Sequence, residues 1–92
     1  MSHCDNPLHG FTVVVETSGP MVYIGRYHSE DDDSLLLLDV DARELADASA
    51  RAAYLARSAR MGVFKNTENV KVPRAQIASV RRLIEYAASE AP

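Results

Sequence analysis

The sequence predicts a mostly β fold: five strongly bent strands in one small barrel, a helix inserted between the third and fourth strands, and a short C-terminal helix. Three observations predict this fold. The first part of the chain holds β-branched and aromatic residues between turn residues, residues 42–61 change abruptly to alanine-rich sequence, and a short apolar run resumes at Val70. The 92 residues suit one domain, spanning 1–92, with one modest core.

Two strands joined by a turn open the predicted barrel. Residues 11–17 are rich in β-branched side chains, and residues 18–20 are turn chemistry, because glycine accepts positive φ and proline fixes its own φ. Residues 21–28 then alternate between two faces. Gly25 in mid-strand is unfavourable unless another backbone approaches closely or the strand bends, and a barrel this small requires strongly bent strands.

An acidic turn separates the second strand from the third. Residues 29–33 contain four acids, whose mutual repulsion disfavours a strand. Consecutive acids in a tight turn do not converge on one cation, unlike the alternately spaced acids of a calcium loop. We therefore interpret the run as a solubilising turn that also discourages strand pairing. Residues 35–40 follow as an apolar strand, predicted to be buried on both faces.

Residues 42–61 are predicted to form the inserted helix. Alanine dominates this segment, β-branched residues are absent, and Gly62 occupies the position where glycine is favoured after a helix. Asp47 and Ser49 are both suitable N-cap residues. The side chains that we expect on the buried face are Ala46, Ala50, Ala53, Tyr54 and the stem of Arg57.

The segment after the helix is predicted to be a loop over residues 61–69 and a short strand over residues 70–72, which ends at Pro73. Residues 73–88 are ambiguous. Apolar residues recur there at helical spacing and propensity slightly favours a helix, while the barrel requires a fifth strand. We expect a single turn at residues 73–76, a strand at 77–82, and a short helix to about residue 88.

The net charge of −3 conceals an asymmetry along the chain. Residues 1–50 contain ten acids and two bases, whereas residues 51–92 contain eight bases and three acids. The two halves of a barrel interleave, so the charges can largely cancel. Two alternatives are a basic patch for a polyanion and complementary surfaces for head-to-tail self-association.

The compartment is predicted from the N-terminus and from Cys4. No apolar run approaches the roughly 20 residues that span a bilayer, so we expect no membrane partner. Residues 1–10 lack the basic start and apolar stretch of a secretory signal, and a lone cysteine suits a reducing environment. We therefore expect a cytoplasmic protein.

Residues 18–41 resemble the first half of the Sm-like (LSm) motif. The residues that carry the resemblance are Gly19, Tyr23, Gly25, Asp31, Asp32, Asp33, Ser34, Leu36 and Leu38. The likeness covers residues 10–41 and, more loosely, 69–83. The whole chain also looks like a set of small, uncharacterised bacterial Sm-like proteins with a comparable helical insert. The resemblance implies an Sm-like or SH3-like barrel, and the turn before the fifth strand is a frequent ending for SH3-like barrels.

The resemblance also implies a binding activity. In Sm-like proteins, the acid and asparagine of the second turn help to form a pocket for a base of single-stranded RNA; Asp33 and Ser34 are the nearest equivalents here. The family's later Arg-Gly pair is replaced by Pro73-Arg74-Ala75, in which Arg74 could supply the cation.

An aromatic residue beside a cation suggests where a base could stack. Phe64 precedes Lys65, and Arg60 lies near the end of the predicted helix. The full set of predicted RNA-binding residues is Asp33, Ser34, Arg60, Phe64, Lys65 and Arg74. The alternative is that Phe64 closes the end of the barrel and the arginines are solvated, and the overall acidity of the chain counts against RNA.

Self-association is predicted from the open edges of a five-stranded barrel, which must be paired, covered or charged. In Sm-like proteins the fourth and fifth strands pair between neighbours and close a ring. The predicted edge residues of such a homo-oligomer are Val70, Val72, Ile77 and Val80. The alternative function is a protein–protein interaction module that docks through the helix at 42–61, without nucleic acid.

The sequence contains no recognisable catalytic or metal centre. His28 lies two residues from Glu30, but no orienting third group, oxyanion hole or glycine-rich phosphate loop accompanies them. His3, Cys4 and His9 lack the paired short spacings of structural zinc sites. A barrel this small also offers no interior cavity from which to exclude water. We therefore expect a non-enzymatic protein with no catalytic residue, no metal and no cofactor.

Overall fold

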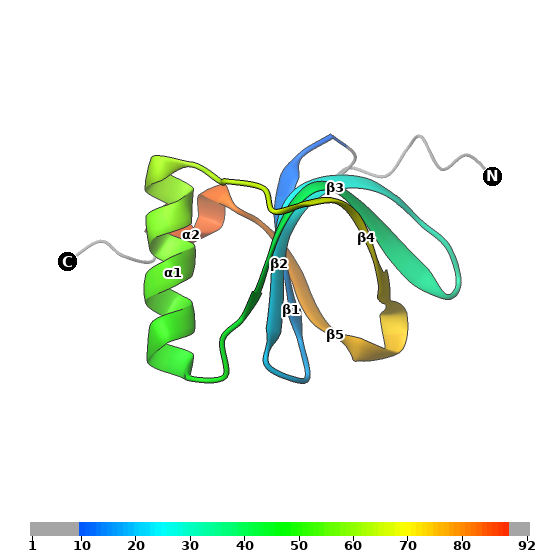
Figure 1. Cartoon of the computed structure of the whole chain (residues 1–92), viewed down its shortest axis with the longest axis horizontal. Helices are drawn as coiled ribbons and strands as arrows, with labels where there is room; N and C mark the ends of the chain where they lie inside the picture. The colour runs from blue at the N-terminus through cyan, green and yellow to red at the C-terminus, as the bar shows by residue number, and fades with distance from the viewer. Residues whose placement is uncertain (1–9, 89–92) are drawn as a thin grey trace.

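The computed structural model describes residues 10–88 and contains five strands, one long helix and one short C-terminal helix (Figure 1). The elements in chain order are β1 (Thr12–Thr17), β2 (Met21–Glu30), β3 (Ser34–Glu44), α1 (Ala48–Met61), β4 (Thr67–Pro73), the 3₁₀ turn η2 (Arg74–Gln76), β5 (Ile77–Arg82) and α2 (Ile84–Ala88). The predicted mostly β fold is confirmed, including the helix between the third and fourth strands. The choice of a strand followed by a helix after residue 76 is also confirmed.

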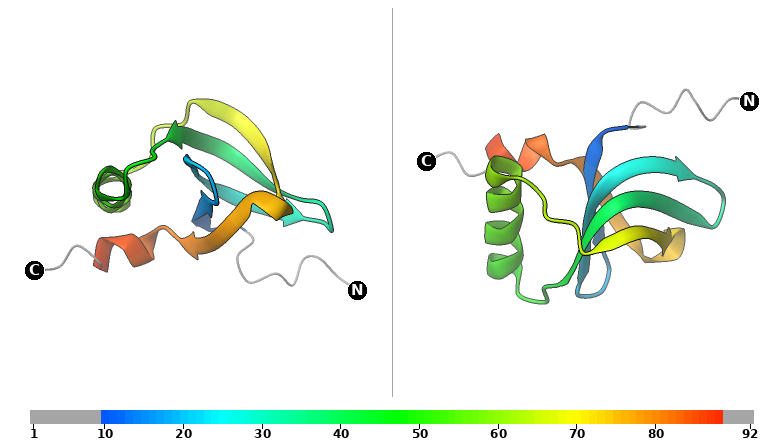
Figure 2. Two further views of the ribbon diagram at one scale, coloured as in Figure 1. Left: turned by 90° about the horizontal axis from the view of Figure 1, so that it is seen from below. Right: turned by 45° about the horizontal axis from the view of Figure 1, so that its top comes forward.

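The five strands form one antiparallel sheet in the order β4-β3-β2-β1-β5. β4 and β5 are therefore the two edge strands, and η2 joins them directly. The sheet curls so that β4 and β5 lie on opposite sides of a common interior, while α1 and α2 stand together beyond one end of the sheet (Figure 2). The described sheet is open, because β4 and β5 are not neighbours in the ladder. Neither helix is long and apolar enough to cross a membrane.

Two bulges bend the long β2–β3 pair. Opposite Gly25, β3 places two residues, Asp39 and Val40, and the register shifts by one. Asp39 has a φ of 52°, the left-handed conformation that occurs at bulges. A second shift in the opposite sense makes His28 the extra residue of β2. The bend that the mid-strand glycine predicted is therefore present.

Apolar clusters lie on both faces of the curled sheet, because successive strand side chains point to opposite sides. The cluster inside the curl comprises Val13, Val15, Tyr27, Leu35, Leu37, Val40 and Val72. The cluster beneath the helices comprises Val14, Val22, Ile24 and Leu55, with Tyr54, Val63, Leu83 and Tyr86 packed against it. β1 is thus buried on both faces and joins the two halves of the core.

Helix α1 begins later than predicted. β3 continues to Glu44 while it pairs with β2, so the helix starts at Ala48 rather than at residue 42. Asp47 is the N-cap, and its carboxylate accepts a hydrogen bond of 2.8 Å from a backbone N–H of the first turn. Gly62 follows the last turn with a φ of 103°. Both caps agree with the sequence prediction.

The buried face of α1 was predicted wrongly. Leu55, Ala56 and Ser58 are its buried residues, and Tyr54 is half-buried. The side chains predicted to be buried but found exposed are Ala46, Ala50, Ala53 and Arg57. Leu55 is the only large aliphatic side chain of the helix that reaches the core, and it sets the orientation. Alanines on every side of a helix carry no directional signal.

Strand β4 is longer than the predicted strand at 70–72. It starts at Thr67 and stays paired with β3 as far as Pro73. The polar residues at its start suggested a loop, but one side of an edge strand is open to solvent and tolerates polar side chains. The loop between α1 and β4 is consequently short.

Replacing Gly25 with alanine should destabilise the fold by about 1–3 kcal/mol, because the new Cβ would overpack a tight site. That Cβ would lie 2.9 Å from Val40 Cγ2 and 3.1 Å from the Leu38 carbonyl oxygen. Urea unfolding measures the change. Gly19→Ala is the matched control, because a Cβ added there would meet no atom within 4 Å beyond its chain neighbours, and it should leave the unfolding free energy nearly unchanged. Equal stability of the two variants would contradict the close approach at Gly25.

Candidate functional site

The predicted RNA-binding residues fall into two separate groups. One group, at the turn between β2 and β3, contains Asp33, Ser34 and Arg74, and the other, at the end of α1 and the following loop, contains Arg60, Phe64 and Lys65. β4 runs along β3 from Ser34, near the first group, to Val40, near the second. At ~3.3 Å per residue the groups lie about 20 Å apart along the strand. They do not form one site.

Two of the predicted cations are already paired with carboxylates. Arg74 donates to Glu30, and the Lys65 ammonium lies 3.1 Å from Glu68 and 3.3 Å from Asp39. The hydrogen bonds that Lys65 donates to Glu68 and, to a smaller extent, to Asp39 raise the pKa of Lys65. Such pairing lowers the positive charge that these side chains can offer to a phosphate.

The acidic turn is held by Asp31. Its Oδ1 accepts hydrogen bonds of 2.8 Å from the backbone N–H groups of Asp33 and Ser34. These bonds lower the pKa of Asp31, and they form an Asx turn that accounts for an acid at this position without a cation. No three His, Cys, Asp or Glu side chains within residues 10–88 are placed to hold a metal ion. The terminal His3, Cys4 and His9 lie outside the described residues.

The predicted oligomer edges are indeed the edge strands, but their apolar side chains face inward. Val72 is buried, and Val70, Ile77 and Val80 are half-buried against the cluster inside the curl. The apolar side chains of β4 and β5 are therefore not available to a second chain, although the edge backbone is. The exposed side chains along β4 and β5 include Lys71, Pro73 and Arg81, and both charge and proline discourage edge pairing.

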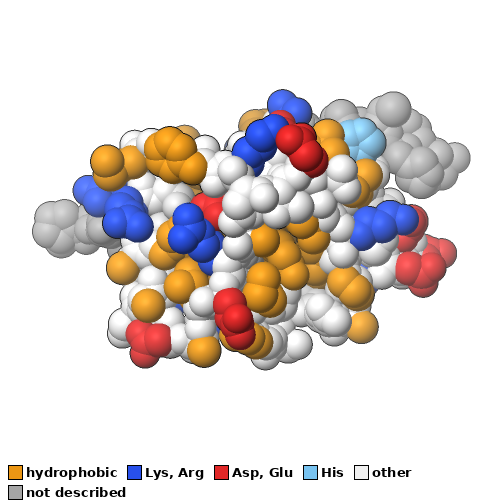
Figure 3. Space-filling model, viewed as in Figure 1, with side chains coloured by type: hydrophobic (Ala, Val, Ile, Leu, Met, Phe, Trp, Pro, Cys, Tyr) orange, Lys and Arg blue, Asp and Glu red, His pale blue; other side chains and the backbone are white. Residues whose placement is uncertain are grey.

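A hollow of about 260 Å³ lies where α1 ends beside β3. The residues that line it include Asp41, Arg43, Tyr54, Arg57, Met61 and Phe64. We call its rim, formed by Arg43, Arg57, Met61 and Phe64, the α1-end surface. Hydrophobic and basic side chains lie side by side on the upper part of the α1 end of the molecule, while acidic side chains occur at its lower part and in a cluster at the opposite end (Figure 3).

The floor of the hollow is a buried carboxylate. Asp41 is only 3 % exposed, and it accepts hydrogen bonds from the Tyr54 hydroxyl, from Arg43 Nε at 2.9 Å and from the Asn66 side-chain amide at 3.2 Å. Burial, followed by the hydrogen bond to Asp41, raises the pKa of Tyr54 to about 12. One carboxylate thus connects β3, α1 and the loop that leads to β4.

Two large apolar side chains stand exposed on the rim of this hollow. Met61 is 70 % exposed and Phe64 is 77 % exposed. The backbone on both sides of Phe64 is anchored, because Val63 packs against the cluster beneath the helices and the Asn66 N–H donates to the Val40 carbonyl at 2.8 Å. The anchored neighbours Val63 and Asn66 therefore keep the Phe64 side chain in its exposed position.

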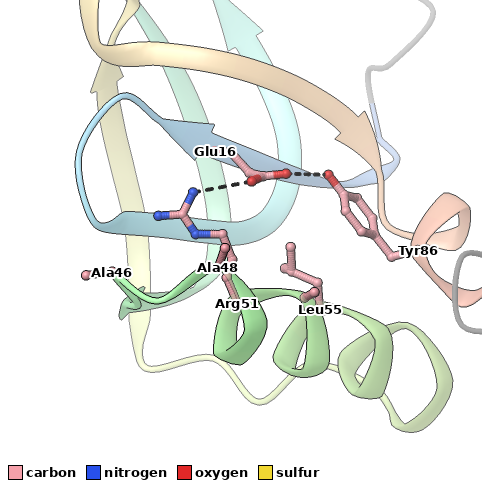
Figure 4. A pocket seen from close by; sticks show the side chains of 7 residues that line it. Glu16, Ala46, Ala48, Arg51, Leu55 and Tyr86 are labelled. Atoms are coloured by element: carbon pink, nitrogen blue, oxygen red, sulfur yellow. Dashed lines mark hydrogen bonds and ion pairs between the residues drawn. The ribbon is translucent and has the colours of Figure 1, made fainter.

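A second pocket of about 330 Å³ lies between the start of α1, β1 and α2 (Figure 4). Glu16 lies in its wall, 3.4 Å from Arg51 Nη1 and 2.9 Å from the Tyr86 hydroxyl. Burial, followed by the hydrogen bond to Glu16, raises the pKa of Tyr86 to about 12. Arg51 also donates to the Leu45 carbonyl at 2.9 Å. These polar groups satisfy one another, so they anchor both helices to β1.

His28 and Glu30 do not form a catalytic pair. His28 Nδ1 lies 3.1 Å from Ser29 Oγ at the exposed bulge of β2. Glu30 instead accepts hydrogen bonds from the Tyr27 hydroxyl and from Arg74. Its carboxylate therefore serves the turn and the η2 connection.

Comparisons with known proteins show the fold of the chain but no family. No family model matches the sequence, and no curated protein matches it. A chain from the crystal structure of the NatC complex bound to CoA matches with a TM-score of 0.54 at 19 % identity, covering 89 % of this chain and 87 % of that chain. A chain from the NatC complex bound to Gag peptide and CoA matches with a TM-score of 0.56 at 17 % identity, covering 88 % and 93 %.

The expectation of a non-enzymatic protein is wrong, because this fold also occurs in a chain of an enzyme complex. Chains that share this fold over most of their length belong to the NatC N-terminal acetyltransferase complex, in structures bound to CoA. That expectation rested on the absence of catalytic motifs and of an interior cavity, but a small chain can be one part of a larger enzyme complex without carrying the catalytic groups itself. The Sm-like resemblance, the RNA site, the homo-oligomer and the cytoplasmic location stay predictions.

The two tyrosines that hold the helices predict a loss of stability at high pH. Their folded pKa values of about 12 lie above the ordinary value of 10.0, so the folded state favours the neutral hydroxyl. The stabilisation is complete below pH 10 and is lost as the pH rises towards 12. Urea unfolding across this range should show a falling free energy, and absorbance titration should show, by comparison with the phenylalanine variants, that Tyr54 and Tyr86 titrate late. Tyr54→Phe with Tyr86→Phe should flatten the fall; an unchanged slope would contradict the assignment.

Proposed function

We propose that this chain is a subunit of a larger protein assembly, an enzyme complex, which it joins through the α1-end surface. The observation that carries the proposal is the pair of exposed side chains Met61 and Phe64 on the rim of one hollow. Single exposed apolar residues are common, but large ones grouped around a depression mark interaction sites. Burying one such side chain contributes about 1.5–3 kcal/mol.

The composition of the surface supports a protein partner. Aromatic residues, methionine and arginine are enriched at protein interfaces, and a few of them carry most of the binding energy. The α1-end surface contains one phenylalanine, one methionine and two arginines around about 260 Å³ of open space. This docking position lies at the end of the inserted helix, in agreement with the alternative function predicted from the sequence.

The fold comparisons add independent support for a subunit role. The two matching chains come from a complex, and the match covers 87 % and 93 % of their lengths, so they are about as small as this chain. A chain of this size and fold thus has a place in a multi-chain enzyme. We extend that role to the present protein, without extending the identity of the substrate or cofactor.

We also propose that the open sheet is a strongly bent, Sm-like barrel. The support comes from the two bulges in the β2–β3 pair, from the curl of the sheet around one apolar cluster, and from the three-residue η2 turn that joins the edge strands. The Sm-like pattern of residues 18–41 is consistent with this geometry, because Gly25 stands at one of the bulges.

RNA binding by a homo-oligomer is the second candidate function. One observation favours it: Asp33, Ser34 and Arg74 lie together, with the Arg74 N–H donating to the Asp33 carbonyl at 2.9 Å. The ion pairs of Arg74 and Lys65, the distance between the two residue groups and the charged edges favour protein docking instead.

Replacing Met61 and Phe64 with serine should abolish the partner contact without unfolding the protein, because both side chains are mostly exposed. Tagged protein expressed at its natural level in its native host should co-purify with one stoichiometric partner, identified by mass spectrometry, and the double variant should lose it. Ile84→Ser is the matched control, since Ile84 is 69 % exposed on α2 and does not line the hollow. Retention of the partner by the double variant would refute this docking surface.

Light scattering on a sizing column, with and without a short poly-U oligonucleotide at low salt, separates the two candidates. The docking proposal predicts that the oligonucleotide elutes apart from the protein and leaves its mass unchanged. A ring-sized particle that co-elutes with the oligonucleotide would favour the RNA function, and Arg74→Ala would then be the first variant to make.

A further inference from the structure

The α1-end surface carries unused positive charge beside its apolar side chains. Arg57 is exposed and makes no ion pair with any acid of residues 10–88. Arg57 and Met61 are four residues apart on α1 and therefore lie on one face of the helix. A cation and an exposed thioether are thus presented together towards the hollow.

Arg43 contributes the second cation. Its Nε donates to Asp41, and its guanidinium carbon lies 5.4 Å from the centre of the Tyr54 ring. The side chain is still 51 % exposed, and its hydrogen bond to Asp41 is made by Nε rather than by a terminal nitrogen. Arg43 is therefore fixed in orientation while its outer donors remain available to a ligand.

We propose that this hollow binds an acidic segment of the partner protein, which inserts one large apolar side chain between Met61 and Phe64 and places a carboxylate against Arg57 and Arg43. The inference rests on the proposed docking function and specifies the chemistry of the partner. Guanidinium groups pair with carboxylates through two parallel hydrogen bonds, which gives the contact direction as well as charge.

The charge of the hollow selects an acid. A partner without a carboxylate would cover Arg57 and remove its water without replacing the lost hydrogen bonds, which is unfavourable. A basic segment would add repulsion from two arginines. The carboxylate of Asp41 does not offset this repulsion fully, because it lies buried and already accepts three hydrogen bonds.

The size of the hollow is compatible with one inserted side chain of a partner protein. Sites for drug-sized ligands have volumes of about 300–1,000 Å³, and this hollow has about 260 Å³. Met61 is unbranched and flexible, so it can adapt to the shape of an inserted aliphatic or aromatic group. The anchored backbone around Phe64 reduces the ordering that binding requires.

A protein segment fits this surface better than single-stranded RNA. A polyanion requires a track of cations, whereas beyond the two arginines of the rim the neighbouring Lys65 is paired with Glu68 and Asp39. These two carboxylates would repel a phosphate backbone that continued from the hollow along the loop. Phe64 alone could stack a base, so an oligonucleotide belongs among the outcomes of the test.

The test is a charge swap measured by fluorescence anisotropy. Three labelled peptides serve as probes. The first has one central phenylalanine flanked by glutamates, the second has lysines in place of the glutamates, and the third keeps the glutamates but has serine in place of the phenylalanine. A labelled poly-U oligonucleotide is the fourth probe. The proteins are the wild type, Arg57→Glu, Phe64→Ser and Arg81→Glu, an exposed arginine of β5 that does not line the hollow. Circular dichroism confirms that each variant is folded.

The wild type should prefer the glutamate peptide with phenylalanine over the other probes by about ten-fold or more, as expected for a buried anchor paired with a charge. Arg57→Glu should reverse the preference towards the lysine peptide, Phe64→Ser should lose about ten-fold or more in affinity, and Arg81→Glu should behave as the wild type. Equal binding of acidic and basic peptides, no binding of any peptide, or tighter Phe64-dependent binding of the oligonucleotide would overturn the proposal.

Co-purification of the native partner with each variant distinguishes a failure of this inference from a failure of the proposed docking function. If the partner is lost with Met61→Ser and Phe64→Ser but retained by Arg57→Glu, the acidic segment is wrong and the docking surface stands. If the partner is retained by all of these variants, both proposals fail. Loss in Arg57→Glu with retention in Arg81→Glu supports both.

Discussion

The buried carboxylate of Asp41 connects the sheet to the two segments that form the α1-end surface, helix α1 and the loop that carries Phe64. A buried charge is stable only when donors surround it, and here each of three donors belongs to a different segment. Tyr54 links α1 to Asp41, and Asn66 links the loop that holds Phe64 to the same carboxylate. Removing one donor from a buried acceptor typically costs about 1–3 kcal/mol, and more when the acceptor is charged. The arrangement of the α1-end surface therefore depends on Asp41, which is buried beneath it.

The position of Asp41 depends in turn on the bulge opposite Gly25. Leu35 and Leu37 point into the curl, so an unbroken alternation would send the side chains of Asp39 and Asp41 into the same apolar cluster. The extra residue shifts the phase, which places Val40 inside and Asp41 on the face beneath α1. A close contact at one glycine thus decides which side of the sheet receives the charges.

The strands and helix caps could be predicted from the sequence because their signals are local. Alternation, turn residues and the capping pair Asp47 and Gly62 do not depend on distant contacts. The grouping of Arg57 and Met61 with Phe64 could not be predicted, since it depends on how Leu55 orients an alanine-rich helix. Phe64 was singled out as an aromatic beside a cation, although its Lys65 neighbour proved to be paired with acids. The only sequence signal for this grouping was the spacing of Arg57, Met61 and Phe64, which are four and three residues apart at the end of the predicted helix.

Both helices are fastened to the sheet by a tyrosine that donates to a carboxylate, Tyr54 to Asp41 and Tyr86 to Glu16. α1 buries few side chains besides Leu55, so little apolar contact supplements its clamp. Elements with few buried contacts have low local stability, and a partner that binds only the folded form stabilises them. A protein that covers Met61 and Phe64 would bury apolar surface at the C-terminal end of α1, where this chain buries little of its own. The exposed end of α1 is therefore the part of this fold that an assembly would complete.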